Sequence, residues 1–138
     1  MINTKELRLG NWVYKVDSNG NKTQKKVFSI QENYVSLEKQ RGNPCYKTLV
    51  EPIQLTEDIL VNSGFEYVNN RYYALDLKNN LAIGFIDGRV LMFLIDGEGD
   101  LGFKVMRSTR IISYVHELQN LYYDLTGNEL NIIFTTVQ

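Results

Sequence analysis

The first fifty residues alternate between apolar and polar positions in short runs, as β-strands do. Trp12, Tyr14 and Val16 recur at every second position and would share one face of a strand. Turn-forming residues follow this segment, and Glu32-Asn33 forms a second break. The pattern predicts three antiparallel strands, over residues 12–16, 26–30 and 34–37. A meander of this kind indicates a small SH3-like barrel or curled sheet, to which residues 45–50 can add a further strand.

A short central helix is predicted between Pro52 and Gly64. Thr56 suits the N-cap, because its hydroxyl can accept a hydrogen bond from an amide of the first turn. Glu57 and Asp58 suit the positive start of the helix, and Gly64 supplies a left-handed stop.

Strand-like runs return after this helix, and Asp87-Gly88 between two of them is a strong two-residue hairpin signal. The pattern predicts four strands, over residues 72–77, 81–86, 89–95 and 101–106. A longer helix is then expected from Ile111 to Thr126. Its apolar positions form one core-facing stripe at helical spacing: Ile111, Ile112, Val115, Leu118, Leu121, Tyr122 and Leu125. Gly127 would end this helix, and Leu130–Val137 would form a last strand.

Together these elements predict an α+β fold. The N-terminal antiparallel SH3-like barrel or meander is followed by the short helix and by antiparallel strands packed by the C-terminal helix. The chain of 138 residues, 43% hydrophobic and 22% charged, has the size and composition of one domain over residues 1–138. Residues 1–50 and 51–138 as two sub-lobes are the alternative.

The N-terminus lacks the apolar run of a signal peptide, and the apolar stretches are too short to cross a bilayer. Cys45 is the only cysteine, so an internal disulfide is excluded. We therefore expect a cytoplasmic protein without membrane contact.

Charge is unevenly distributed along the chain. Residues 1–50 hold nine Lys/Arg against four Asp/Glu, a net +5, whereas residues 51–138 hold six against twelve, a net −6. The basic part also contains aromatic residues, a mixture found in proteins that bind single-stranded nucleic acid. The candidate nucleic-acid-binding residues are Lys15, Lys25, Lys26, Arg41, Lys47 and Tyr34. The competing interpretation is that the aromatic residues are core and the lysines keep strand edges soluble.

Catalytic signatures are missing from the sequence. His116, the only histidine, has no nucleophile that sequence can place beside it, and we expect it at the surface or at the boundary of the core. Asp96, Glu98 and Asp100 alternate like calcium ligands, but Leu101 and Arg107 stand where such a loop needs glycine and glutamate. Gly97-Glu98-Gly99 lacks the lysine of a phosphate loop, and we expect Cys45 to be an inert thiol. No catalytic residue, metal ligand or cofactor is predicted.

Three tyrosines of the last helix extend its aromatic surface beyond the single apolar stripe that faces the core. Tyr114, Tyr122 and Tyr123 are therefore candidate interface residues, for a protein partner or a homodimer.

Three segments carry a family resemblance: Glu6–Val13, Glu51–Thr56, and Tyr114–Tyr122 with the following Leu125-Thr126-Gly127. They resemble a family of small uncharacterised proteins from gut Bacteroidetes and their phages and prophages. The resemblance spans nearly the whole chain and implies an accessory protein of a mobile element. It supplies no catalytic residue. The leading functional hypothesis is a non-enzymatic protein-binding module. A weak nucleic-acid-binding protein is the alternative, and an enzyme with a spatially assembled carboxylate or histidine site is the third.

Overall fold

The computed structural model describes the backbone of residues 2–37, 45–46, 49–68, 70, 72–77, 81–86, 89–95, 103–106 and 111–134. These residues form two compact units, each built from two separate stretches of the chain. Unit 1 consists of Met1–Gln54 and Tyr114–Asp124, and unit 2 consists of Leu55–Ser113 and Leu125–Gln138.

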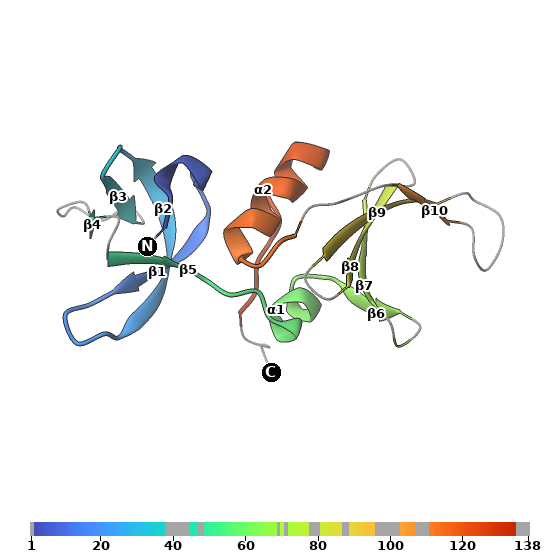
Figure 1. Ribbon diagram of the computed structural model, residues 1–138, viewed down its shortest axis with the longest axis horizontal. Helices are drawn as coiled ribbons and strands as arrows, with labels where there is room; N and C mark the ends of the chain where they lie inside the picture. The colour runs from blue at the N-terminus through green and yellow to red at the C-terminus, as the bar shows by residue number, and fades with distance from the viewer. Residues whose placement is uncertain are drawn as a thin grey trace. The chain divides into compact units, whose positions relative to one another are not determined.

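Unit 1 contains an antiparallel sheet of five strands in the order β4-β3-β2-β1-β5 (Figure 1). Its strands are β1 (Trp12–Val16), β2 (Lys22–Ile30), β3 (Tyr34–Leu37), β4 (Cys45–Tyr46) and β5 (Val50–Pro52). The predicted meander of the first three strands is confirmed. The second strand is longer than predicted, because Lys22–Lys26 pair with β1 along its whole length.

The turn between β1 and β2 forms as its side chains indicate. The Asp17 carboxylate accepts hydrogen bonds from the amides of Asn19 and Asn21, and Gly20 has a positive φ of 81°. Lys22–Lys26 of β2 pair with β1, whereas Val27, Ser29 and Ile30 pair with β3, with a register shift between Val27 and Ser29. One long strand therefore serves both neighbours.

The core of unit 1 is an aliphatic cluster on one side of this sheet. Its buried members are Ile2, Leu7, Val13, Val27, Val35, Leu37 and Val50. A short 3₁₀ helix, η1 (Thr4–Glu6), precedes β1 and is capped by the side chain of Asn3, which accepts from the amide of Lys5. Ile2 and Leu7, on either side of this turn, are both part of the cluster.

Helix α2 (Val115–Thr126) starts four residues later than the predicted helix. The backbone before it is extended, because Ile111 bridges Arg89 and Tyr114 bridges Gln54 in antiparallel fashion. Glu117 then accepts a hydrogen bond from the amide of Tyr114, as in a capping box. Backbone pairing with segments distant in sequence therefore replaces the first predicted turn. The predicted stop is confirmed, since Gly127 has a φ of 73°.

Unit 2 contains a second antiparallel sheet, in the order β10-β9-β8-β7-β6. Its strands are β6 (Glu66–Val68), β7 (Tyr72–Asp76), β8 (Leu81–Ile86), β9 (Arg89–Ile95) and β10 (Phe103–Met106). Four of them were predicted, whereas β6 was not, because three residues give too short a pattern. Ile86 pairs with Arg89, so β8 and β9 form the predicted antiparallel pair, whereas the predicted turn residues Asp87-Gly88 lie outside the described part of the chain.

Helix α1 (Glu57–Asn62) is shorter than the predicted segment. The predicted cap is confirmed, because the Thr56 hydroxyl accepts from the amide of Ile59. Gly64 has the expected positive φ of 107°. Pro52 does not belong to the helix, since it pairs with Val13 as the last residue of β5.

The predicted last strand over Leu130–Val137 is wrong for its described part, because residues 130–134 have no strand partner. Leu130 and Ile132 are buried, which explains the alternation that suggested a strand. The amide of Ile133 donates to the hydroxyl of Ser63 instead of a neighbouring strand. Residues 135–138 lie outside the described part of the chain.

The fold is thus α+β, with two antiparallel sheets and two α-helices in the described residues. In this part of the chain the sheet of unit 1 ends at β4 and β5, and no closed barrel forms.

Candidate binding face on strands β1 and β2

The side of β1 and β2 that faces away from the aliphatic cluster carries aromatic and charged side chains. Trp12 stands opposite Lys26, Tyr14 opposite Gln24, and Val16 opposite Lys22. Tyr14 also faces Glu51 of β5. Since strand residues alternate between faces, the buried Val13 lies on the other side. We call Trp12, Tyr14, Lys22, Lys26, Phe28 and Glu51 the β1–β2 outer face.

The aromatic side chains of this face are accessible. Phe28 is 52% exposed, whereas Trp12 and Tyr14 are partly exposed. Phe28 lies at the point where the register of β2 shifts, and we assign its ring to the outer face because it is exposed and takes no part in the aliphatic cluster. Because about half of Phe28 is exposed, its ring can contact another molecule.

Two lysines lie over the aromatic rings of the face. The Lys26 ammonium is 5.2 Å from the centre of the Trp12 ring, and that of Lys22 is 5.8 Å from the Tyr14 ring. Lys22 also forms an ion pair with Glu51, with 2.7 Å between Nζ and Oε2. The hydrogen bond to Glu51 raises the pKa of Lys22, and the same bond lowers the pKa of Glu51. Lys22 and Glu51 therefore both stay charged at neutral pH and their charges cancel. The net positive charge of the outer face is then that of Lys26.

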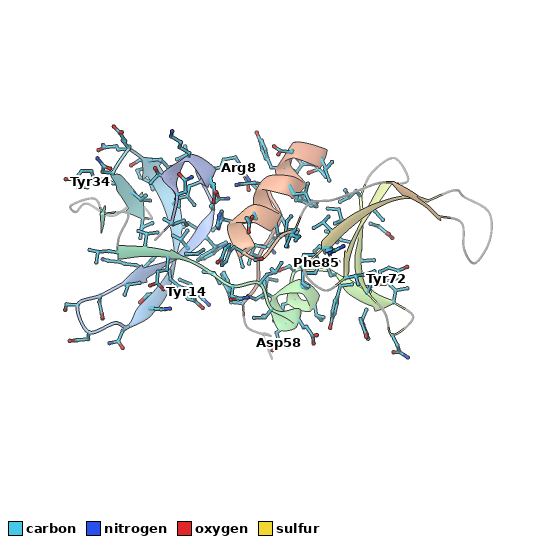
Figure 2. The ribbon with its side chains drawn as sticks, viewed as in Figure 1. Arg8, Tyr14, Tyr34, Asp58, Tyr72 and Phe85 are labelled. Carbon is cyan, nitrogen blue, oxygen red and sulfur yellow. The ribbon has the colours of Figure 1, made fainter. Side chains whose placement is uncertain are left out.

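The predicted nucleic-acid-binding residues do not gather on one surface. Lys26 lies on the β1–β2 outer face, whereas Lys15 and Lys25 alternate onto the opposite face of the same strands. Tyr34 is on β3, and Figure 2 shows it well apart from Tyr14. The remaining two candidates, Arg41 and Lys47, lie outside the described residues.

The predicted interface tyrosines occupy three different environments. Tyr114 precedes α2 and stacks on the His116 ring with 5.9 Å between ring centres. Tyr123 is partly exposed, and the Arg8 guanidinium lies over its ring at 4.2 Å from the ring centre. Tyr122 is half-buried. Their role at an interface stays a prediction.

A set of polar residues that the sequence analysis did not single out joins α2 to the start of β1. The buried Gln119 carboxamide accepts from the amide of Trp12 at 2.8 Å and donates to the carbonyl of Gly10 at 3.2 Å. It thus bonds the backbone on either side of Asn11, as a residue of a parallel strand would. Gln119 therefore extends the hydrogen bonding of β1 beyond the end of β5.

Asn11 and Asn120 continue this connection. The Asn11 amide group donates to the side-chain oxygen of Asn120 at 2.9 Å, and Asn120 donates to the carbonyl of Glu6 at 2.8 Å. Arg8 donates to the carbonyl of Gln119 at 3.3 Å. These contacts hold the strand that carries Trp12 and Tyr14, so they position the outer face. The sequence indicates these contacts only in that the polar residues Gln119 and Asn120 lie next to apolar positions of the helix.

His116 is buried, with 1% of its surface exposed, so the expectation of a surface or boundary position is wrong. Helix α2 buries more than its apolar stripe, because the segment before β1 covers the next row of side chains. Glu6 Oε2 lies 3.8 Å from Nε2, too far for a hydrogen bond, and neither ring nitrogen has a hydrogen-bond partner among the described residues. Burial lowers the pKa of His116, although Glu117 and Glu6 act in the opposite direction. The ring is neutral at pH 7, and its burial keeps it from a substrate in solvent.

Within the described ranges, no group of three or more His, Cys, Asp or Glu side chains is placed to hold a metal ion. The loop with Asp96, Glu98 and Asp100 lies outside those ranges, and of Cys45 only the backbone, in β4, is described. No helix in the described part of the chain has the length and apolar character needed to span a membrane.

Comparison with known proteins gives no relative: no family model, no curated protein and no solved structure matches the chain. The function must therefore be argued from the geometry.

Proposed function

We propose that this protein is a non-enzymatic protein-binding module that engages its partner through the β1–β2 outer face. It would act in the cytoplasm as an accessory protein of a phage or prophage, as the resemblance of its three segments implies. The observation that carries the proposal is the exposure of Phe28 on β2, the strand next to the one that carries Trp12 and Tyr14. Tryptophan, tyrosine and phenylalanine are enriched at protein interfaces, where they contribute large contact areas.

The charge of unit 1 favours protein over nucleic acid as the partner. Although residues 1–50 carry a net +5, unit 1 also includes Glu51, Glu117 and Asp124, so its nine Lys/Arg stand against seven Asp/Glu, a net +2. Lys22 is ion-paired with Glu51 on the outer face itself. Aromatic anchors with mixed charge around them are typical of protein interfaces.

We also propose an SH3-like arrangement for unit 1, with the barrel left open in the described residues. Its support is the strand order β4-β3-β2-β1-β5, together with a long β2 that pairs first with β1 and then, across a register shift, with β3. Leu49, directly before β5, has 3₁₀ geometry and fits this description. Small barrels of this type host many functions, so the face and not the fold carries the functional argument.

The test is affinity capture from host cells with the tagged protein and two matched variants. Phe28→Ser removes an exposed ring from the outer face. Ile111→Ser removes an exposed apolar side chain, 59% exposed, from unit 2. We expect a protein that is retained by the wild type and by Ile111→Ser and is lost with Phe28→Ser. Equal retention by all three would overturn the proposal.

A second candidate is single-stranded nucleic-acid binding on the same face. It is favoured by the pairing of Lys26 with Trp12, since basic side chains beside stacking aromatic rings are what such proteins use. Because Lys25 and Lys26 lie on opposite faces, they form a matched pair for the test. Anisotropy of labelled oligothymidine at low salt should fall with Lys26→Ala and not with Lys25→Ala, and binding should weaken steeply with salt. No binding by the wild type at low salt would exclude this candidate.

A further inference from the structure

Unit 2 carries a surface whose chemistry complements the β1–β2 outer face. Tyr67 and Tyr73 form a cross-strand pair between β6 and β7, with 4.8 Å between ring centres. Tyr67 is 53% exposed. Burial raises the pKa of Tyr73, and Glu57 and Asp58 of α1 act on it in the same direction, so both carboxylates lie within electrostatic range of its hydroxyl. We call Glu57, Asp58, Tyr67 and Tyr73 the acidic aromatic patch.

Both carboxylates of this patch are exposed at the first turn of α1, and the last turn of this helix contains no basic residue. Unit 2 as a whole holds six Lys/Arg against nine Asp/Glu, a net −3, whereas unit 1 has a net +2. The two units of one chain therefore carry opposite net charges. Each also presents aromatic side chains beside charges of the corresponding sign.

On the outer face the charge available to a partner is that of Lys26. Lys22 is neutralised by Glu51, whereas no ion pair of Lys26 is found within the described residues. A partner that places a carboxylate next to Lys26 and an aromatic ring next to Phe28 would match both features. The acidic aromatic patch supplies carboxylates and a ring in one place.

We infer that the partner of the β1–β2 outer face is the acidic aromatic patch of a second copy of this chain. This inference rests on the proposed function, because it names the occupant of the same face. The contact is heterologous: each copy offers two different surfaces, so association continues from copy to copy until it closes into a ring or extends as a filament. Opposite charges across the contact make its strength depend on salt.

Sedimentation of the full chain over a range of concentrations tests the inference. The wild type should associate at low salt and dissociate at high salt. Lys26→Glu and Asp58→Lys should each weaken association by about tenfold or more, since each sets like charges against one another. The double variant, which exchanges the two charges, should restore association. Lys25→Glu and Asp76→Lys are the controls, because they make the same charge changes elsewhere on the two units and should leave association unchanged.

A wild type that stays monomeric at every concentration would overturn the inference, as would a double variant no better than the single ones. The proposed function is tested by a different result, the capture of a protein partner. If the chain is monomeric but still captures a protein that Phe28→Ser loses, the face binds a different protein. If Phe28→Ser changes neither association nor capture, both the inferred self-association and the proposed function are wrong.

Discussion

At the scale of single residues, the carboxamide of Gln119 shows how one side chain can take the place of backbone. It bonds the amide of Trp12 and the carbonyl of Gly10, both of which lack a strand partner on that side because β5 ends at Pro52. Each of these groups would cost about 1–3 kcal/mol if it were left buried and unpaired.

Gln119→Leu keeps the volume of the side chain and removes both hydrogen bonds. We expect the free energy of unfolding to fall by about 2–4 kcal/mol, as measured by urea denaturation. Gln54→Leu is the control, since Gln54 is exposed and its replacement should change stability by less than about 0.5 kcal/mol. Equal effects of the two substitutions would mean that the Gln119 hydrogen bonds are not formed in solution.

His116 makes stability depend on pH. Burial lowers its pKa in the folded chain below the ordinary value of 6.5, so the unfolded chain binds more protons in the interval between the two values. The stabilising effect is therefore complete above pH 6.5 and is lost as the pH falls through the folded value.

Urea denaturation between pH 5 and 7, at about half-unit steps, should show stability decreasing toward acid in the wild type. His116→Phe should abolish most of this slope, because the chain has no other histidine. The NMR signal of the single imidazole gives its folded pKa directly. A value above 6.5 would show that Glu6 and Glu117 outweigh burial.

At the scale of elements, α1 is too short to be stable without its cap and its packing. Its six residues make fewer than two turns, and Thr56 satisfies one of the amides that the first turn leaves open. Glu57 and Asp58 add favourable charge at the same end. The cap thus contributes to the position of the acidic aromatic patch as well as to stability.

Thr56→Ala should lower the free energy of unfolding by about 1 kcal/mol, measured by urea denaturation. Thr56→Ser keeps an oxygen that can accept from the amide of Ile59 and should recover most of the loss. Thr23→Ala, at an exposed position of β2, is the matched control and is expected to have a much smaller effect. A loss with serine as large as that with alanine would contradict the capping role.

At the scale of the whole molecule, most of the sequence of unit 2 lies between the two stretches of the chain that form unit 1. The chain leaves unit 1 after Gln54 and re-enters it at Tyr114, and these two residues are antiparallel bridge partners. The amide of Val115 also donates to the carbonyl of Ile53 at 2.9 Å. The two residues at which the chain leaves and re-enters unit 1 are therefore adjacent, as at the two ends of a hairpin loop.

Joining Gln54 to Tyr114 through a two-residue Asn-Gly turn should consequently give a folded unit 1. The shortened chain, continued to Asn128 to complete α2, is expected to unfold cooperatively in urea and to give dispersed NMR signals. Residues 1–54 alone should not fold, because they lack Gln119 and Asn120. A shortened chain without a cooperative transition would show that unit 1 needs unit 2.

The strands, turns and cap that were predicted correctly depend on neighbouring residues. Asp17 and Gly20 form their turn, Thr56 caps α1, and Gly127 ends α2, in each case through contacts within a few positions. The sequence by itself also determined that Trp12 and Tyr14 share a face, because strand alternation requires it. The predicted single domain over residues 1–138 stays a prediction.

Only the tertiary structure decided which distant segments meet. Gln119 and Gly10 are 109 positions apart, and no local pattern indicates that a helical glutamine will complete a strand. The same packing buries His116, delays the start of α2 and leaves residues 130–134 without a strand partner. It also gives the two units net charges of +2 and −3, a smaller contrast than that between residues 1–50 and 51–138, by placing Glu51, Glu117 and Asp124 with the basic strands. Hydrogen bonding and burial between remote segments depend on the path of the whole chain, whereas periodicity records only what each segment prefers alone.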